Sequence, residues 1–152
     1  MGLLSRLLGT TSVPRDLLAD LAEDYRAESS QATRLRQQAE RARYPQAAQE
    51  LRRLADIEAR HATWLRERLV ALGGRTPDVD PPPMTGSNQW QRVVAALQEA
   101  QAKRRRLIEQ IMHWDPNEPE VVALLRRIAQ EDLREQGAYE ALVMRSDPQA
   151  LD

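Results

Sequence analysis

Residues 50–74 read ELRRLADIEARHATWLRERLVALGG. Its leucines and alanines recur at spacings of three and four, which places them on one face of a helix. Glu58 and His61 lie in the middle of this apolar stripe. A carboxylate and an imidazole on a buried face are costly unless they are paired, hydrogen-bonded or coordinated to a metal. In helix bundles, Glu-x-x-His is also the spacing with which one helix gives two ligands to one metal site.

The composition narrows the class of protein. The chain has 152 residues, a net charge of −1 and no cysteine. This length predicts one domain with a real core. The charge gives no indication of nucleic-acid binding, and no apolar run is long enough to span a bilayer. The lack of cysteine excludes disulfides, zinc–thiolate sites and iron–sulfur clusters, and it is compatible with the cytoplasmic location that we expect. Strong helix formers dominate, which favours an all-α fold.

Four long helical segments are predicted. Prolines, glycines and cap-like residues give their limits. The expected helices run from Pro14 to Ala42, from Pro45 to Leu72, from just after Ser87 to about Trp114, and from Asn117 to just before Asp147. We therefore expect a short leucine-rich leader over residues 1–13, a bundle over 14–146 and a tail over 147–152.

The connections between these segments predict how the helices are arranged. Only short turns separate the first from the second and the third from the fourth, so each pair should form an antiparallel hairpin. Between the pairs, residues 73–86 read GGRTPDVDPPPMTG, without an apolar period. Extended, this segment would cover roughly 43 Å, about one bundle length. A ferritin-like four-helix bundle uses one long crossover of this kind between helices two and three.

Polar residues interrupt each apolar stripe near the middle of its helix. If four antiparallel helices of similar length pack together, their midpoints lie at one height. The sequence therefore predicts one polar layer in the core. Its expected members are Glu28, Glu58, His61, Gln101, Arg104, Asp132 and Glu135. On the third helix, this prediction takes the core stripe to be Trp90, Val94, Leu97, Gln101, Arg104, Ile108 and Ile111.

The chain resembles the rubrerythrin-like branch of the ferritin-like superfamily. The strongest match is residues 50–74, and a weaker one is LLRRIAQEDLREQGAYEAL over residues 124–142. The resemblance implies two iron or manganese ions, held by a Glu from each of two helices and a Glu-x-x-His from each of the other two. Glu28, Glu58 and His61 match the first half of that set.

The second half departs from the family pattern. Asp132 stands in place of Glu and Glu135 in place of His, while Gln101 replaces the Glu of the third helix. In another register Glu131 would be the ligand and Arg134 would replace the His. Glu99 is a further candidate, but its neighbours Lys103 and Arg106 indicate a solvated face. No register restores the full ligand set.

Two functions therefore remain open. In the first, Glu28, Glu58, His61, Asp132 and Glu135 hold iron or manganese, for a redox, oxidative-stress or metal-handling role, with Tyr25 as a hydrogen-bond donor nearby. Carboxylates and imidazole suit these metals.

In the second, the bundle is metal-free. The Arg104 guanidinium neutralises the carboxylates in a buried salt-bridge network, and the protein acts as an interaction or scaffold module. Metal ions are the expected partners in the first reading. A homodimer is a further possibility, as is docking of a partner through the leader.

Overall fold

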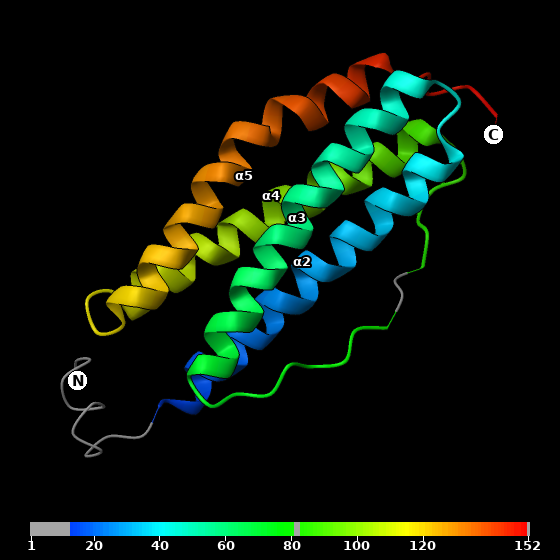
Figure 1. The fold of residues 1–152 in the computed structure, drawn as a ribbon. Helices are drawn as coiled ribbons and strands as arrows, with labels where there is room; N and C mark the ends of the chain where they lie inside the picture. Colours follow the sequence, from blue (N-terminus) through cyan, green and yellow to red (C-terminus); the bar gives the residue numbers. More distant parts are fainter. Residues whose placement is uncertain (1–12, 81–82, 152) are drawn as a thin grey trace.

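The computed structural model describes residues 13–80 and 83–151, and within these ranges the secondary structure is helical, without strands. Four long helices account for most of the chain (Figure 1). They are α2 (Arg15–Arg41), α3 (Pro45–Ala71), α4 (Gln89–Trp114) and α5 (Pro119–Arg145). The predicted all-α fold is confirmed, and each helix begins and ends within two residues of its expected limits.

Local sequence signals account for the ends of the helices. Pro45 and Pro119 occupy first helical positions, where a missing backbone N–H costs nothing. Asn88 caps α4 by accepting a hydrogen bond of 2.9 Å from the backbone N–H of Gln91. Gly73 follows the end of α3 with a φ of 86°, a left-handed conformation that favours glycine. The helix limits therefore coincide with the proline, asparagine and glycine residues that favour helix starts and ends.

The helices form two hairpins that pack against each other (Figure 1). α2 packs along α3, and α4 packs along α5. The hairpins meet through contacts of α2 with α4 and of α3 with α5. The described parts of the connection between α3 and α4, residues 72–80 and 83–88, run along the outside of the bundle, and α4 starts at the end where α2 stops. This confirms the predicted bundle with one long crossover, and it makes all contacting helices antiparallel.

The apolar core is divided into two clusters. One cluster contains Leu17, Leu65 and Leu125, and the other contains Leu35 and Leu51. Polar side chains that are almost fully buried lie between these clusters on α2, α3 and α4. They include Glu28, Gln31, Glu58, His61 and Lys103. The predicted polar layer is therefore present, although its membership differs from the prediction on α4 and, for Glu135, on α5.

The orientation of α4 differs from the prediction. Its buried residues are Arg92, Val93, Ala96, Lys103, Leu107, Gln110 and Trp114. The expected stripe, which included Gln101 and Arg104, is half-buried, and its member Ile108 is exposed. The helix is thus rotated by one residue, about 100°. Both stripes have apolar residues at three-four spacing, so periodicity alone does not distinguish them.

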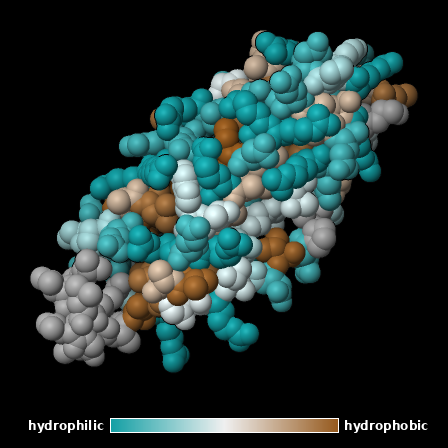
Figure 2. Space-filling view, in the orientation of Figure 1, coloured by the Kyte–Doolittle hydropathy of each residue, from teal (hydrophilic) through white to brown (hydrophobic). Residues whose placement is uncertain are grey.

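The surface is largely polar. Figure 2 shows hydrophilic residues over most of the visible face, with small separate hydrophobic areas. Among the described residues, no helix is both long and apolar enough to cross a membrane. The predicted leader, residues 1–13, lies outside the described residues except for Val13, which packs against the first core cluster.

The buried carboxyl of Asp24 on α2 makes the stability of the fold depend on pH. Its Oδ1 accepts hydrogen bonds from Gln110 Nε2 at 3.1 Å and from Arg106 Nε at 3.2 Å. Burial raises the pKa of this carboxyl from 3.8 to about 7, despite the opposing effect of Arg106. Between these two values the folded state binds more protons than the unfolded state. The contribution of Asp24 to stability therefore falls as pH rises through this window.

We expect the Asp24→Asn variant to remove this contribution, because the amide keeps an acceptor oxygen but cannot ionise. Denaturant unfolding should show little difference from wild type near pH 4. Above pH 7 the variant should be the more stable protein, with each unit of pKa shift contributing at most ~1.4 kcal/mol. A constant difference in unfolding free energy from pH 4 to 8 would contradict this assignment.

Candidate metal centre

The polar layer is organised around the ammonium of Lys103. Lys103 Nζ lies 2.5 Å from Glu28 Oε2 on α2, and it also forms an ion pair with Glu58 on α3. The three side chains are nearly inaccessible to solvent. Lys103 therefore joins three helices through one buried cation, and its charge is compensated on both sides.

The second oxygen of Glu58 is also bound. Tyr139 on α5 donates a hydrogen bond of 2.9 Å from its hydroxyl to Glu58 Oε1. Gln31 Nε2 in turn donates to the Tyr139 hydroxyl at 3.1 Å and to the carbonyl of Ala96 at 3.2 Å. Both Glu58 oxygens thus have protein partners, and the carboxylate is fixed in position.

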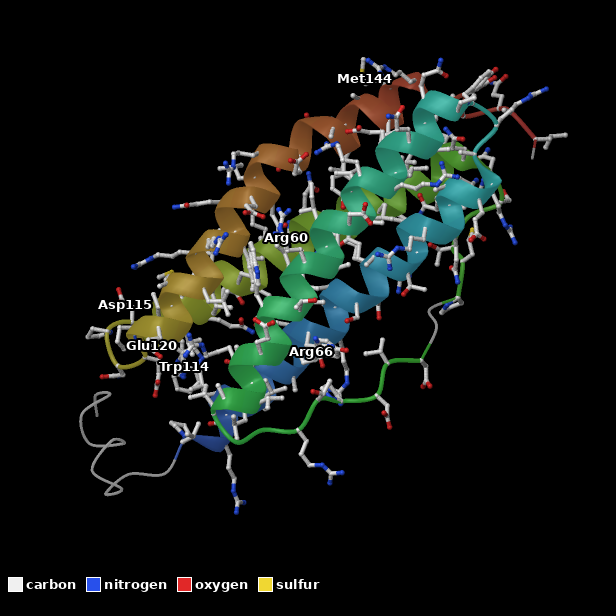
Figure 3. All side chains as sticks on the ribbon, in the orientation of Figure 1. Arg60, Arg66, Trp114, Asp115, Glu120 and Met144 are labelled. Carbon is white, nitrogen blue, oxygen red and sulfur yellow. The ribbon has the colours of Figure 1, made fainter. Side chains whose placement is uncertain are left out.

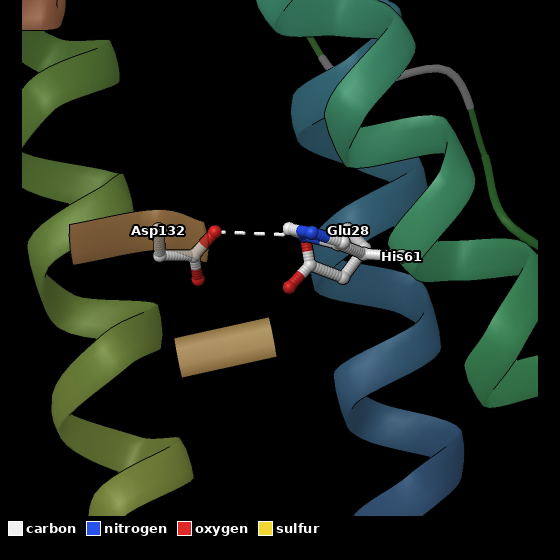
Figure 4. A group of neighbouring side chains, drawn as sticks. All are labelled: Glu28, His61 and Asp132. Atoms are coloured by element: carbon white, nitrogen blue, oxygen red, sulfur yellow. Dashed lines mark ion pairs between the residues drawn. The ribbon is translucent and has the colours of Figure 1, made fainter. Parts of the chain in front are cut away.

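Glu28, His61 and Asp132 form a second group beside this ion pair (Figure 4). One ligand atom from each residue lies within 4.8 Å of the other two. His61 Nδ1 is 3.8 Å from Glu28 Oε2 and 3.5 Å from Asp132 Oδ1. These atoms face a common point but are too far apart for normal hydrogen bonds to each other.

The other ring nitrogen of His61 contacts Glu131, which is not a member of the group formed by Glu28, His61 and Asp132. His61 Nε2 lies 2.7 Å from Glu131 Oε2, which also accepts a hydrogen bond of 2.9 Å from Arg60. His61 Nδ1 and Asp132 Oδ2 are buried and have no hydrogen-bond partner among the described residues. If Nε2 carries the proton, the Nδ1 lone pair points into the group. Metal-ligating histidines characteristically donate their other N–H to a carboxylate in this way.

Burial and neighbouring charges shift the ionisation of the layer. Burial alone would raise the pKa of Glu28, but the Lys103 ammonium holds it below its usual range. Burial, together with the charge of Glu28, raises the pKa of Glu58. Burial would lower the pKa of His61, but the surrounding carboxylates raise it instead. Burial and the Glu28 charge raise the pKa of Asp132 to about 6. Because Glu28 and Glu58 share one ammonium, the negative charge of the layer is only partly compensated, and Glu58, His61 and Asp132 bind protons more tightly than they would in water.

The charge balance indicates how many metal ions the layer accommodates. With Glu28, Glu58 and Asp132 ionised and Lys103 protonated, three negative charges face one positive charge. Glu131 is balanced separately by Arg60. One divalent ion would neutralise the remainder, whereas two would leave excess positive charge in the core. The donor set therefore fits one metal ion and does not fit the dinuclear cluster.

Not all the predicted ligands come together. Glu28, His61 and Asp132 converge, and Glu58 lies beside them on Lys103. Glu135 instead forms an ion pair of 2.6 Å with Arg53 near the surface. Its carboxylate faces the outer side of α3 and is separate from the convergent group.

The predicted α4 members of the layer are also displaced. Among the described residues, neither Gln101 nor Arg104 forms a hydrogen bond or ion pair with a carboxylate of the layer, and Arg104 Nε and Nη1 are buried without a partner. The expected salt-bridge cation is therefore Lys103, because the rotation of α4 turns Arg104 away.

Three further residues considered from sequence have defined positions. Glu131 contacts His61 from outside the group. Arg134 is exposed, and Glu99 is paired with Arg34. In place of Tyr25, which packs against the first core cluster, Tyr139 is the tyrosine bonded to the layer.

Sequence reasoning missed Lys103, which it assigned to a solvated face. One signal was present, because Lys103 is the only lysine among 22 basic residues. It also shares three-four spacing with the apolar residues Val93, Ala96 and Leu107. A compact ammonium on a flexible stem suits a buried position between two carboxylates, whereas arginine suits planar surface pairs.

Comparison with known families agrees with the fold. A family model described as rubrerythrin matches residues 20–131, a range that holds Glu28, Glu58, His61 and Lys103. No curated protein matches the chain significantly. Because the family model covers most of the chain, this protein belongs to the rubrerythrin family of ferritin-like bundles.

Proposed function

We propose that this protein binds one divalent iron or manganese ion through Glu28, His61 and Asp132, and that its role is in redox chemistry, oxidative stress or metal handling. Two predicted ligands take other parts in this proposal. Glu58 supports the site by holding Lys103, and Glu135 acts at the surface.

The observation that carries the proposal is that His61 Nδ1 and Asp132 Oδ2 are buried and form no hydrogen bond among the described residues. Buried polar atoms without a partner are costly, and a bound cation would remove that cost. The Nε2–Glu131 contact gives His61 the orientation that a metal ligand needs.

The chemistry of the donors supports the choice of metal. Two carboxylates and one imidazole suit iron and manganese, and the sequence lacks the thiolates that softer sites use. A bound iron or manganese ion would supply electron transfer to or from oxygen species. The protein's own contribution is a dry, charge-balanced pocket in which Lys103 fixes Glu28, and Tyr139 fixes Glu58.

A second function has support from Lys103. Its ammonium already neutralises part of the layer, and a protonated His61 would neutralise more. In that form the bundle would be a metal-free interaction or scaffold protein. Homodimer formation and docking through the leader stay predictions under either function.

The two functions differ in the metal content of the purified protein. We expect wild type, purified without chelators and reloaded with Mn²⁺ or Fe²⁺, to hold about one equivalent by elemental analysis. His61→Ala should lose most of it, since removal of one of three protein ligands weakens binding by at least the ~10–100-fold typical of outer-shell changes.

His113→Ala is the matched control, because His113 is the only other histidine and is exposed at the end of α4. This control should keep its metal. Wild type that takes up no metal, with an unchanged melting temperature in Mn²⁺ or Fe²⁺, would contradict the metal proposal and favour the scaffold function.

Lys103→Ala tests whether the ammonium occupies the place of a second ion. Without metal, the variant should be less stable by roughly 3–5 kcal/mol, because Glu28 and Glu58 lose their buried counter-charge. Added Mn²⁺ should restore stability, and its stoichiometry should rise from about one equivalent towards two, measured by calorimetric titration.

Arg105→Ala is the control for this experiment, since Arg105 is exposed on the same helix. It should change neither stability nor stoichiometry appreciably. If the Lys103→Ala variant folds and still binds no more than one equivalent, the ammonium does not exclude a second ion.

A further inference from the structure

A basic cavity lies at the end of the bundle where α2 and α5 finish and α3 and α4 begin. It has a volume of about 660 Å³, and Arg41, Arg43, Tyr44 and Arg145 contribute to its lining. Figure 3 shows this end of the molecule beside the labelled Met144 near the end of α5. The cavity is separate from the polar layer at the middle of the helices.

Of the three guanidiniums, Arg145 acts on a nearby carboxylate, because together with Arg53 it lowers the pKa of Glu50. None of Arg41, Arg43 and Arg145 forms a hydrogen bond or ion pair with another described residue. Among the described residues, Asp147 is the one carboxylate in the lining of this cavity, and its Oδ1 accepts a hydrogen bond of 2.9 Å from the backbone of Gln149. The cavity thus carries excess positive charge, and an anion would relieve the repulsion.

Helix dipoles account for only part of this basic cluster. Arg41 and Arg145 lie in the last turns of α2 and α5, where a cation offsets the negative end of the dipole. Arg43 lies in the turn between α2 and α3, outside both helices. The first turns of α3 and α4 are at the same end, and helix N-termini favour anions.

A second cavity of about 450 Å³ continues from the first. It shares Tyr44, Gln89 and Arg145 with the basic cavity, and it adds Ala138 and Leu142 from α5. Its carboxylate, Glu50, is already paired with Arg53 at 2.6 Å. Tyr44 is 61% exposed and lies between the basic and the more apolar space. An exposed aromatic ring at such a position suits a planar group.

We propose that these joined cavities bind an organic phosphate monoester. The phosphate lies among Arg41, Arg43 and Arg145, where guanidinium groups form paired hydrogen bonds with phosphate oxygens. The planar or apolar body of the ligand lies against Tyr44 and extends toward Leu142. This site differs from the metal centre in position, charge and ligand chemistry.

Calorimetric titration of the full chain with adenosine 5′-monophosphate, inorganic phosphate and adenosine tests both parts of the site. We expect the monophosphate to bind at least about tenfold more tightly than either fragment, because it uses both cavities. Arg43→Gln should weaken the binding of both phosphate compounds about tenfold. Tyr44→Ala should weaken the binding of the monophosphate and of adenosine, and it should leave the binding of inorganic phosphate unchanged.

Arg66→Gln is the charge-matched control. Arg66 is an exposed arginine of α3 toward the other end of the bundle (Figure 3). This control should bind the monophosphate as wild type does. His61→Ala should also bind it normally, so failure of the metal proposal does not affect this result.

Three outcomes would overturn the phosphate proposal. The first is the absence of saturable binding of the monophosphate. The second is equal affinity for the monophosphate and inorganic phosphate, which would leave no role for the second cavity. The third is a loss in Arg66→Gln as large as that in Arg43→Gln, which would indicate only general attraction between charges.

Discussion

The contact on which the centre of this bundle depends is the ammonium of Lys103 between Glu28 and Glu58. It joins α4 to α2 and α3 at the height where both apolar clusters are interrupted. Three charged groups in a core are stable only if each is compensated by another. This pairing therefore fixes the rotation of α4, and with it the side chains that face the layer. Arg104 and Gln101 are excluded from the centre as a consequence.

The same contact determines the chemistry that the layer can perform. Because Lys103 occupies the space between two carboxylates, the remaining donors gather on the other side as Glu28, His61 and Asp132. Two protons or one divalent ion can balance the charge that remains. Glu131 and Arg60 complete the arrangement by holding His61 from outside. Under the proposed function, this scaffold would therefore hold one ion in place of two.

At the end of the bundle where α3 and α4 begin, the charges are arranged differently from those in the core. Surface arginines elsewhere on the helices are often paired, as Arg53 is with Glu50 and Glu135. At the end where α3 and α4 begin, Arg41, Arg43 and Arg145 line one cavity without such partners. The core balances its charges internally, whereas this cavity leaves positive charge available to a ligand from solution. The polar layer and the cavity therefore differ in accessibility and in charge.

The amino-acid sequence is enough to predict the helices, their limits and the long crossover, because these follow from three-four spacing, from proline and glycine, and from linker length. It also determined that Glu58 and His61 lie on a buried face. The rotation of α4, in contrast, depends on contacts between helices. Two faces of that helix have similar apolar spacing, and the difference between them lies in whether a charged residue finds partners on other helices. Lys103 finds Glu28 and Glu58, while Glu135 finds Arg53. Such pairings depend on contacts between residues far apart in the chain, so spacing within one helix cannot reveal them.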